Sequence, residues 1–428
     1  DLHLSLRRQR QMCIRDRSKG DIMNFPFLRE DIKQKLERIK EADIVVGIPS
    51  YYNEDTIENV LSQVSCGLEK FYPDYKSVII VSDGGSTDDT REKAESVDTG
   101  KVEKIATIYR GPAGKGSALR AVFAAVCILK AKAGLCLDAD LRSIKPDWVK
   151  KMIGPIIEER CDFVAPLYLR HKYDATITND IAYPLTRALY GIRVRQPIGG
   201  DFAFCSELAR EYLEQNVWNT DVARFGIDIF MTTTAICHGY RIGESPLGAK
   251  SHNPKDPISL TPMFRQVVGT MFNLAEKYEK RWKKIRGSVN PRITGKIEFA
   301  KPDKVTFSVQ RLEANFRAGW ERFSPLWERI LERLNFKHLL RVKEGKDLLY
   351  SSAWAKIVYD YMLAYHKKID KIDKSHLLWS LVPIYQIRVA SFIKETEAMN
   401  NEQAERLIES QALTFEDCKS YLVERWNE

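Results

Sequence analysis

The sequence predicts an α/β fold, a mostly parallel β-sheet with flanking helices, followed by a helical C-terminal region. From residue 43, short apolar runs alternate with stretches of helical period, as in sheets built from strands and crossover helices. Acidic or glycine-rich segments follow several of these runs, where parallel strands would end. Beyond about Pro302, apolar residues recur at spacings of three and four, which indicates helices alone.

The predicted strands and helices alternate along the first half of the chain. Strands are expected at 43–49, 77–83, 102–110, 134–140 and 161–168. Helices are expected at 55–69, near 88–96, and from the loop 111–117 to about residue 132. Residues 173–300 are expected to mix helices with short strands at 202–205 and 240–246. Several strands would then end at one edge of the sheet, where open α/β sheets bind their ligands.

The chain divides into three predicted regions: a leader at 1–22, an α/β catalytic domain at 23–301 and a helical region at 302–428. In the helical region, the apolar run 376–393 is interpreted as a buried or interfacial helix that breaks at Pro383. Thr414, with Asp417 three residues later, predicts a capping box for a last helix.

The leader differs in composition from the rest of the chain. It is rich in arginine and lacks the apolar core and the small-residue cleavage site of a signal peptide. We interpret it as a translated vector segment, an assembly artefact or a ragged start, with the natural beginning near Met23. A mitochondrial presequence is the alternative.

Composition and charge place the chain among globular proteins. Its 44% hydrophobic and 29% charged residues argue against a disordered or fibrous protein. The formal net charge of +9 falls to +5 without residues 1–20, which hold six basic and two acidic side chains. A mild excess spread over the chain favours anionic substrates and gives no sign of a nucleic-acid partner.

The eight cysteines are scattered and form no C-x-x-C pair. Most lie in apolar runs, where a free thiol behaves as a small hydrophobic group. This usage predicts a reducing compartment, and hence a cytoplasmic protein. No window of 18 residues is apolar and free of charge, so no membrane span is expected.

Asp138 and Asp140 follow the apolar run 134–137 in the sequence LCLDADLRS. Two carboxylates at i and i+2 at the end of a buried strand can both face the ligand-binding edge of the sheet. Hard oxygen ligands suit Mg²⁺ or Mn²⁺, which keep positions free for a substrate diphosphate. The pattern therefore predicts a metal site that assists a departing diphosphate, although D-x-D tripeptides also occur at surfaces without function.

The loop GPAGKGS at 111–117 precedes a predicted helix. Its small residues would let the backbone approach phosphate oxygens at a helix N-terminus, and Lys115 adds a full charge. A nucleotide-triphosphatase loop is disfavoured, because that pattern requires G-x-x-x-x-G-K-[ST]. Here Lys115 is followed by Gly116, and Gly111 lies too close to it.

Polar residues also end the first two strands. Asp83, in VSDGGSTDDT, could accept hydrogen bonds from a nucleotide base or ribose, or could simply form the turn before the glycines. The segment PSYYNE, from Pro49 to Glu54, ends the first strand, where a base or ribose would also lie.

Three further features leave alternatives open on the residues alone. His252 could be a third metal ligand or a structural histidine. Asp228, at the start of an apolar helix, could cap that helix or reach a sugar hydroxyl. The sequence GGD at 199–201 could offer two backbone N–H groups to an anionic acceptor, or form a tight turn.

Taken in order, PSYYNE, VSDGGSTDDT and LDAD resemble the GT-A glycosyltransferases with a Rossmann-like fold, family 2 in particular. The region from Tyr173 to Pro254 is similar to the mannosylglycerate, glucosylglycerate and glucosyl-3-phosphoglycerate synthases, which are retaining enzymes. The similarity runs from about residue 43 to 257. PSYYNE departs from a more basic segment in the mannosylglycerate enzymes, and GGD replaces a glutamate-bearing turn.

The resemblance implies roles for matching residues. It implies that Asp138, Asp140 and His252 hold the metal, and that Lys115 and Asp228 are catalytic. The implied donor-binding residues are Pro49, Tyr51, Glu54, Asp83, Lys115, Asp138 and Ala139. The implied acceptor-binding residues are Arg170, Thr178, Ile198, Gly199 and Gly200.

The resemblance also implies a reaction. A hexose, glucose rather than mannose, would pass from a GDP- or UDP-hexose to the 2-hydroxyl of D-glycerate or 3-phosphoglycerate with retention, giving a compatible-solute glycoside such as glucosylglycerate. His171 and Lys172 could bind a phosphate of the acceptor. The alternative is an inverting family-2 enzyme acting on a lipid phosphate or polysaccharide, with Asp228 as general base. A third reading is a nucleotide-sugar-binding regulator, and a homodimer is a further expectation.

Overall fold

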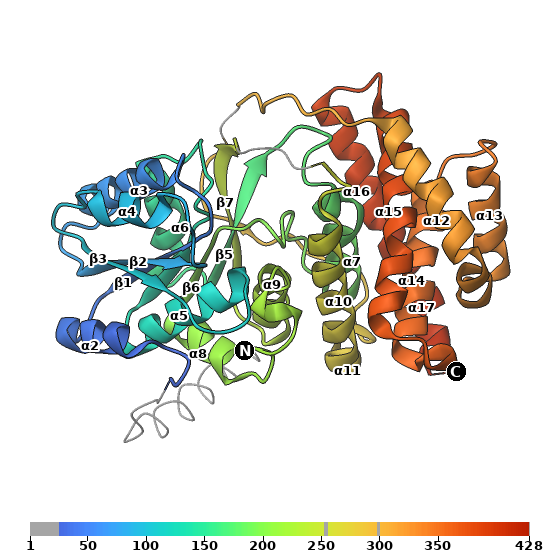
Figure 1. Cartoon of the computed structure of the whole chain (residues 1–428). Coiled ribbons are helices and arrows are strands. Elements are labelled where there is room, and N and C mark those ends of the chain that lie inside the picture. The colour runs from blue at the N-terminus through green and yellow to red at the C-terminus, as the bar shows by residue number, and fades with distance from the viewer. Residues whose placement is uncertain (1–24, 252–255, 298–299, 428) are drawn as a thin grey trace.

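The computed structural model describes residues 25–251, 256–297 and 300–427. The predicted leader at 1–22 lies outside them. The described residues form a mixed sheet with helices on both faces, and a stack of helices that continues from it (Figure 1). This confirms the predicted fold class.

The sheet has eight strands in the order β3-β2-β1-β4-β6-β5-β7-β8. Its strands are β1 (Ile44–Ser50), β2 (Ser77–Asp83), β3 (Glu103–Ile108), β4 (Ala133–Cys136), β5 (Phe163–Leu169), β6 (Phe202–Cys205), β7 (Ile242–Ala249) and β8 (Arg292–Ile293). Strand β6 runs antiparallel to both of its neighbours, and the remaining pairs are parallel.

The helices of the sheet region cover both of its faces. They are α2 (Glu30–Ile39), α3 (Ile57–Phe71), α4 (Thr90–Ser96), α5 (Lys115–Ile128), α6 (Pro146–Ile157), α7 (Tyr183–Tyr190), α8 (Ser206–Glu214), α9 (Ile227–Cys237), α10 (Thr261–Lys277) and α11 (Glu279–Trp282). Alternate residues of β1 point to opposite faces: Ile44, Val46 and Ile48 pack with α3 and α6, whereas Val45 packs with α5. In Figure 1, α3, α4 and α6 lie above the sheet, and α2, α5 and α8 lie below it.

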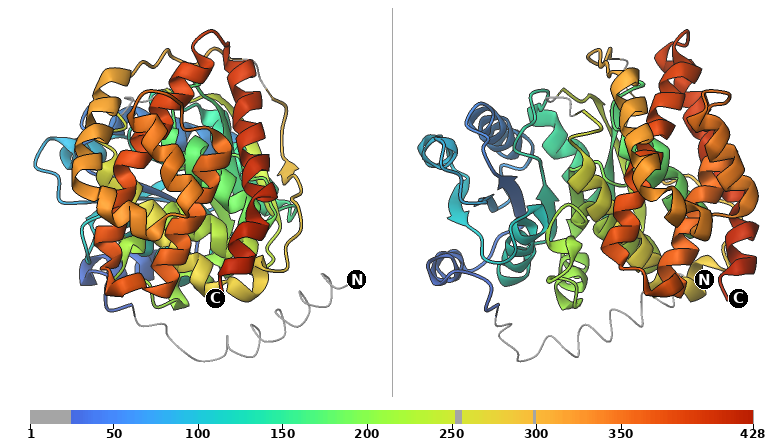
Figure 2. Two further views of the ribbon diagram at one scale, coloured as in Figure 1. Left: turned by 90° about the vertical axis from the view of Figure 1, so that its right-hand side faces the viewer. Right: turned by 45° about the vertical axis from the view of Figure 1, so that its right-hand side comes forward.

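The C-terminal helices stack beside the sheet region on the side of α7 and α10 (Figure 2). They are α12 (Val309–Ile330), α13 (Arg333–Lys343), α14 (Ser351–Lys367), α15 (Lys374–Thr396), α16 (Asn401–Asp417) and α17 (Lys419–Arg425). Their buried side chains, such as Trp354 and Tyr385, belong to the same hydrophobic core as Phe123 of α5 and Phe230 of α9. Along the described residues, no helix is long and apolar enough to cross a membrane.

Two predictions for the helical region were wrong. Helix α15 runs through Pro383 without breaking, and the proline ring packs where Gly319 of α12 has no side chain. Thr414 lies inside α16, where its hydroxyl donates to the carbonyl of Ser410. The capping box is instead at the start of α16, between Asn400 and Gln403.

Strand β4 is shorter than predicted and ends at Cys136. Beyond it, the N–H of Leu137 still donates to Gly47 O at 3.0 Å, but the N–H of Asp138 donates 2.7 Å to the carboxylate of Asp201. A side chain thus replaces the neighbouring strand as hydrogen-bond partner. The chain leaves the sheet here, and both aspartates of LDAD lie in a loop beyond the strand.

Candidate active site

A cavity of about 600 Å³ opens at the carboxyl ends of β1, β4 and β5. Twelve of the predicted site residues line it: Pro49, Tyr51, Lys115, Asp138, Ala139, Asp140, Arg170, Thr178, Ile198, Gly199, Gly200 and Asp228. Glu54 and Asp83 do not line it, and His252 lies outside the described residues. The folded chain therefore brings together segments that are more than a hundred residues apart in sequence.

Lys115, in the first turn of α5, lies between two predicted functional carboxylates. Its Nζ lies 2.7 Å from Oδ1 of Asp138 and 3.1 Å from Oδ1 of Asp228, and it donates to the carbonyl of Gly200 at 3.0 Å. Burial would lower the pKa of Lys115, but Asp138 and Asp228 outweigh burial and raise that pKa. The ammonium group is therefore charged and ties the loop after β4 to the start of α9.

A second lysine, Lys250 at the end of β7, approaches Asp138 from the other side. Its Nζ lies 3.2 Å from Oδ2 of Asp138 and 3.0 Å from Oδ2 of Asp201, and it donates to the carbonyl of Gly199. Asp201 also accepts a 2.5 Å hydrogen bond from the hydroxyl of Tyr168. Burial raises the pKa of Asp201, although Lys250 acts against it.

The sequence did not indicate that Lys250, Asp201 and Tyr168 would belong to this polar cluster. Asp201 entered the sequence analysis only as part of the GGD segment, and Lys250 did not enter it. A charged residue directly after a strand that ends at the ligand edge was the available signal for Lys250. Nothing in the spacing of Tyr168 separates it from an ordinary core tyrosine.

Asp138 is held on both oxygens by these lysines. Burial would raise its pKa, but Lys115 and Lys250 outweigh burial and lower the pKa of Asp138 below its usual range. The carboxylate is ionised, but a metal ion on Asp138 would share its oxygens with two ammonium groups. The sequence prediction of two equivalent metal ligands did not anticipate this.

Asp140 differs from Asp138. It lines the same cavity and is partly exposed, and among the described residues no hydrogen bond or ion pair engages its carboxylate. The described residues hold no group of three His, Cys, Asp or Glu side chains suited to a metal. Mg²⁺ often uses only one or two carboxylates together with substrate phosphates, so the donor set present fits such an ion.

Two glycines of the loop 111–117 also have a packing role that the sequence did not indicate. A Cβ atom on Gly116 would lie 1.9 Å from the carbonyl oxygen of Val222, and one on Gly114 would lie 2.6 Å from Cα of Arg224. The missing side chains therefore admit the backbone of residues 222–224. That packing places Lys115 at the cavity, and the predicted approach of the loop to a phosphate stays a prediction.

Asp83 forms the turn after β2, one of its two predicted alternatives. It is 1% exposed, and its oxygens accept from the N–H groups of Gly85 and Ser86 and from the hydroxyls of Ser50 and Ser86. Glu54 accepts from the N–H of Asp89. Among the predicted donor-binding residues at these strand ends, Tyr51 and Pro49 are the ones that face the cavity.

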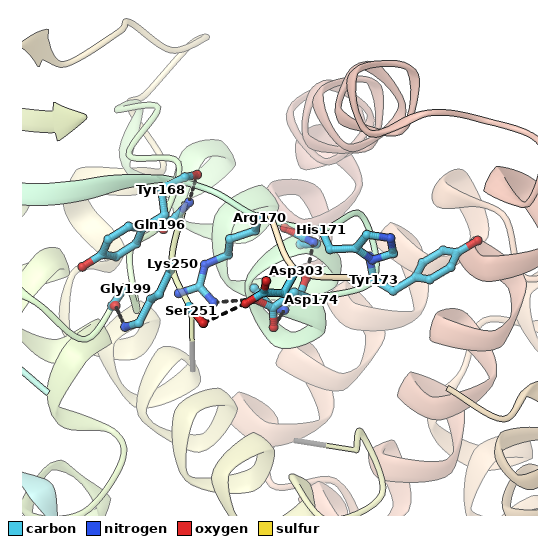
Figure 3. Close-up of polar contacts among 12 residues, drawn as sticks. Tyr168, Arg170, His171, Tyr173, Asp174, Gln196, Gly199, Lys250, Ser251 and Asp303 are labelled. Carbon is cyan, nitrogen blue, oxygen red and sulfur yellow. Dashed lines mark hydrogen bonds and ion pairs between the residues drawn. The ribbon is translucent and has the colours of Figure 1, made fainter. Parts of the chain in front are cut away.

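On the other side of the cavity, Arg170 forms an ion pair with Asp174 at 2.9 Å. Figure 3 shows Arg170 on the side of Lys250, whereas His171 and Tyr173 point toward the C-terminal helices. Lys172 donates to the carbonyls of Thr396 and Met399 at 2.6 Å each. The suggestion that His171 and Lys172 bind a phosphate of the acceptor is therefore not supported, since neither lines the cavity.

A mostly parallel sheet with one antiparallel strand and an Asp-x-Asp pair beside buried lysines at its carboxyl edge define the class of protein, a glycosyltransferase of GT-A fold. Residues 45–215 match the family model described as Glycosyl transferase family 2. No curated protein sequence matches the chain.

Solved structures similar to this chain include glucosyl-3-phosphoglycerate synthase from Mycobacterium tuberculosis in complex with Mn²⁺, UDP and phosphoglyceric acid. That match has 26% identity and a TM-score of 0.43, over 56% of this chain and 81% of that one. The same enzyme with Mg²⁺ and UDP matches with 26% identity and a TM-score of 0.43, over 56% and 82%. Mannosyl-3-phosphoglycerate synthase from Rubrobacter xylanophilus matches with 20% identity and a TM-score of 0.45, over 61% and 82%.

Proposed function

We propose that this glycosyltransferase moves a hexose from a GDP- or UDP-hexose to the 2-hydroxyl of D-glycerate or 3-phosphoglycerate, with retention of configuration. Glucose is favoured over mannose. The observation that carries the proposal is the cluster of Lys115, Asp138 and Asp228 beside Asp140, in the same cavity as Arg170. This arrangement provides for a diphosphate, a metal ion and an anionic acceptor within one cavity.

Asp140 and one oxygen of Asp138 would hold Mg²⁺ or Mn²⁺, with His252 as the expected third ligand. The metal ion, when bound, supplies positive charge to the departing diphosphate. Lys115 lines the cavity beside Asp138, so its positive charge would act on the same diphosphate. Preorganised charge of this kind stabilises a transition state more than the ground state.

Arg170 supports a carboxylate on the acceptor. Its guanidinium has the planar fork that binds carboxylates in two places, and Thr178 lines the same end of the cavity. The acceptor must compete with Asp174 for Arg170. Because Lys172 is engaged by α15, unphosphorylated glycerate is favoured over 3-phosphoglycerate.

The retaining and the inverting mechanism give Asp228 different roles. In a retaining enzyme it orients sugar hydroxyls, and Lys115 fixes its position. In an inverting enzyme it would accept the acceptor's proton, and burial raises the pKa of Asp228 in a way that suits a base. NMR of the product separates these roles, because a β-linked product from an α-linked donor would overturn retention.

A thermal-shift screen with Mn²⁺ and GDP- or UDP-sugars tests the donor side directly. We expect one nucleotide to raise Tm in the presence of Mn²⁺, and glycerate to raise it further. Turnover assays with glycerate and 3-phosphoglycerate then identify the acceptor. The absence of stabilisation by any of these nucleotides would contradict the proposal.

Replacing Asp140 tests the metal site. Asp140→Ala is expected to lower turnover by about 10²-fold or more, since metal charge on a leaving group contributes several kcal/mol. Its Tm without metal is expected to match that of the unaltered protein, because no hydrogen bond or ion pair within the described residues holds the carboxylate. Asp147→Ala, which removes a surface partner of Lys151, is the matched control. An Mn²⁺-dependent shift that survives Asp140→Ala would contradict this assignment.

A further inference from the structure

The segment 170–182, here called the acceptor segment, has two sides. Arg170, Asp174, Thr176 and Thr178 line the cavity. The opposite side of the segment meets the C-terminal helices α14, α15 and α16. The contacts on that side come from residues more than 170 positions later in the chain.

The last part of the acceptor segment is a π-helical turn, Thr178–Ala182. Its carbonyls receive side chains from the C-terminal helices: Gln411 donates to Asn179 O at 2.9 Å, and Trp354 donates to Asp180 O at 2.6 Å. π-Helical turns are rare, and they are frequent at functional sites. Side chains of the C-terminal helices therefore hold the turn that carries Thr178, on the side away from the cavity.

A buried ion pair anchors the same turn. Arg388 of α15 is fully buried, and its Nε lies 3.3 Å from Oδ1 of Asp180. Arg388 also pairs with Glu395 at 2.5 Å and donates to Gln411 at 3.0 Å. A buried pair of this kind strongly disfavours any arrangement that separates its charges, so it fixes the position of the turn.

Thr176 is held in a similar way. Its hydroxyl and that of Tyr385 lie 2.6 Å apart, and both are buried. The Tyr385 ring stacks on Phe264 of α10, with centroids 4.2 Å apart and planes at 19°. The hydroxyl of Tyr385 therefore reaches the acceptor segment from a ring that is itself fixed.

We propose that Tyr385, Arg388 and Gln411 are positioning residues for the acceptor, which act through Thr176 and the π-turn and do not act on the donor. This inference rests on the proposed function, in which the acceptor segment binds the acceptor. The donor side, with Tyr51 and Lys115, makes none of these contacts. The C-terminal helices thus affect the affinity for the acceptor although they lie outside its binding site.

Tyr385→Phe is the test, because it removes one hydroxyl and keeps the stacked ring. We expect the acceptor KM to rise about three- to tenfold, the effect of losing one buried hydrogen bond. The donor Kd and kcat are expected to stay within about twofold. Tyr359→Phe is the matched control: its hydroxyl is equally buried in the helical region, but donates to Phe415 O.

Hydrogen exchange provides a second measurement that does not depend on the acceptor's identity. In Tyr385→Phe, amides of 174–182 are expected to exchange faster, whereas those of 111–118 are expected to be unchanged. If the unaltered protein transfers nothing to glycerate or 3-phosphoglycerate, the proposed function is wrong, and exchange alone decides this inference. Unchanged exchange at 174–182, or equal effects of the two tyrosine variants on acceptor KM, would overturn it.

Discussion

Two lysines and three aspartates share the carboxyl edge of the sheet. Lys115 and Lys250 both contact Asp138, and each contacts a further aspartate, Asp228 or Asp201. Buried charges are costly unless they are paired, and removing one partner leaves the others uncompensated. The cluster is therefore rigid without ligand, and it presents fixed charges to whatever enters the cavity.

Lys115→Met tests this cluster. Removing the ammonium leaves Asp138 and Asp228 as like charges near one another, and removes a donor to the diphosphate. We expect turnover to fall by about 10²- to 10³-fold, as for other preorganised donors to a transition-state charge. Lys132→Met, which removes a surface ion pair with Asp43, is expected to leave turnover unchanged. Steady-state kinetics compares them, and a variant that keeps a tenth of the activity would rule out the role of Lys115.

Glu244, in β7, gives a prediction about pH. It is 3% exposed, and burial raises its pKa to about 7, although the N–H of Arg195 donates to it. A raised folded-state pKa favours the protonated form, so the stabilising contribution is complete below about pH 4.5 and is lost as pH rises through 7. Glu244→Gln lacks this titration.

Chemical unfolding at several pH values measures the effect. Between pH 4 and pH 8, the free energy of unfolding of Glu244→Gln is expected to rise relative to the unaltered protein by up to about 3 kcal/mol. Glu344→Gln, at an exposed position paired with Lys346, serves as control and is expected to show no such trend. A constant difference between Glu244→Gln and the unaltered protein across this range would contradict the raised pKa.

At the scale of elements, the start of α5 depends on a close backbone contact. Gly116 lies against residues 222–223, and its N–H donates to Arg224 O at 3.1 Å. The same turn carries Lys115. Local packing of two backbones therefore determines where the charge of Lys115 lies.

Gly116→Ala is expected to displace the start of α5, because its Cβ would overlap the Val222 carbonyl. We expect a loss of about 1–3 kcal/mol in unfolding free energy, as for overpacked sites, together with a loss of turnover. Gly154→Ala, inside α6 with ordinary contacts at 3.5 Å, is the matched control. It is expected to be neutral or to stabilise by about 0.5–1 kcal/mol. Thermal and chemical unfolding measure both, and equal stability of the two variants would contradict the contact.

The sequence predicted β1, β2 and β5 well because they are buried along most of their length and appear as continuous apolar runs, whereas the short exposed β8 was not predicted. Strand β2 has the predicted bounds. The end of β4 was missed because Asp201, 63 residues away, takes the hydrogen bond that would extend the strand. The helix break at Pro383 was wrong: α15 continues through it, and its ring packs against Gly319 of another helix. Local patterns carry no information about such partners.

Prediction of the site was limited in the same way, to residues that local patterns indicate. Motifs at strand ends placed Asp138, Asp140 and Lys115 correctly in the cavity, because parallel strands end at one edge. Lys250 and the support from Tyr385 depend on contacts across 112 and 209 residues. The contact of Lys250 exists only once β7 lies beside the loop after β4, and that of Tyr385 only once the helical region has folded onto the sheet region.

At the scale of the whole molecule, one hydrophobic core joins the sheet to the C-terminal helices. It runs from Phe123 in α5 through Phe264 in α10 to Trp354 and Tyr385. Ion pairs bridge the same boundary, including Arg187 with Glu409 and Arg195 with Glu405. The apolar side chains that meet in this core come from both parts, so neither part buries that surface alone.

The continuous core predicts that sheet and helices unfold together. Calorimetry is expected to give a single transition, with calorimetric and van't Hoff enthalpies in a ratio near one.

Because the donor binds only the folded cavity, a nucleotide sugar at 100 times its Kd is expected to raise the free energy of unfolding of the whole chain by about 2.7 kcal/mol. Far-ultraviolet circular dichroism and tryptophan fluorescence are expected to report the same midpoint, since Trp148 lies in α6 and Trp354 in α14. Two transitions, of which only one moves with the nucleotide, would show that the helices fold independently and would remove the physical basis for coupling α15 to the acceptor segment.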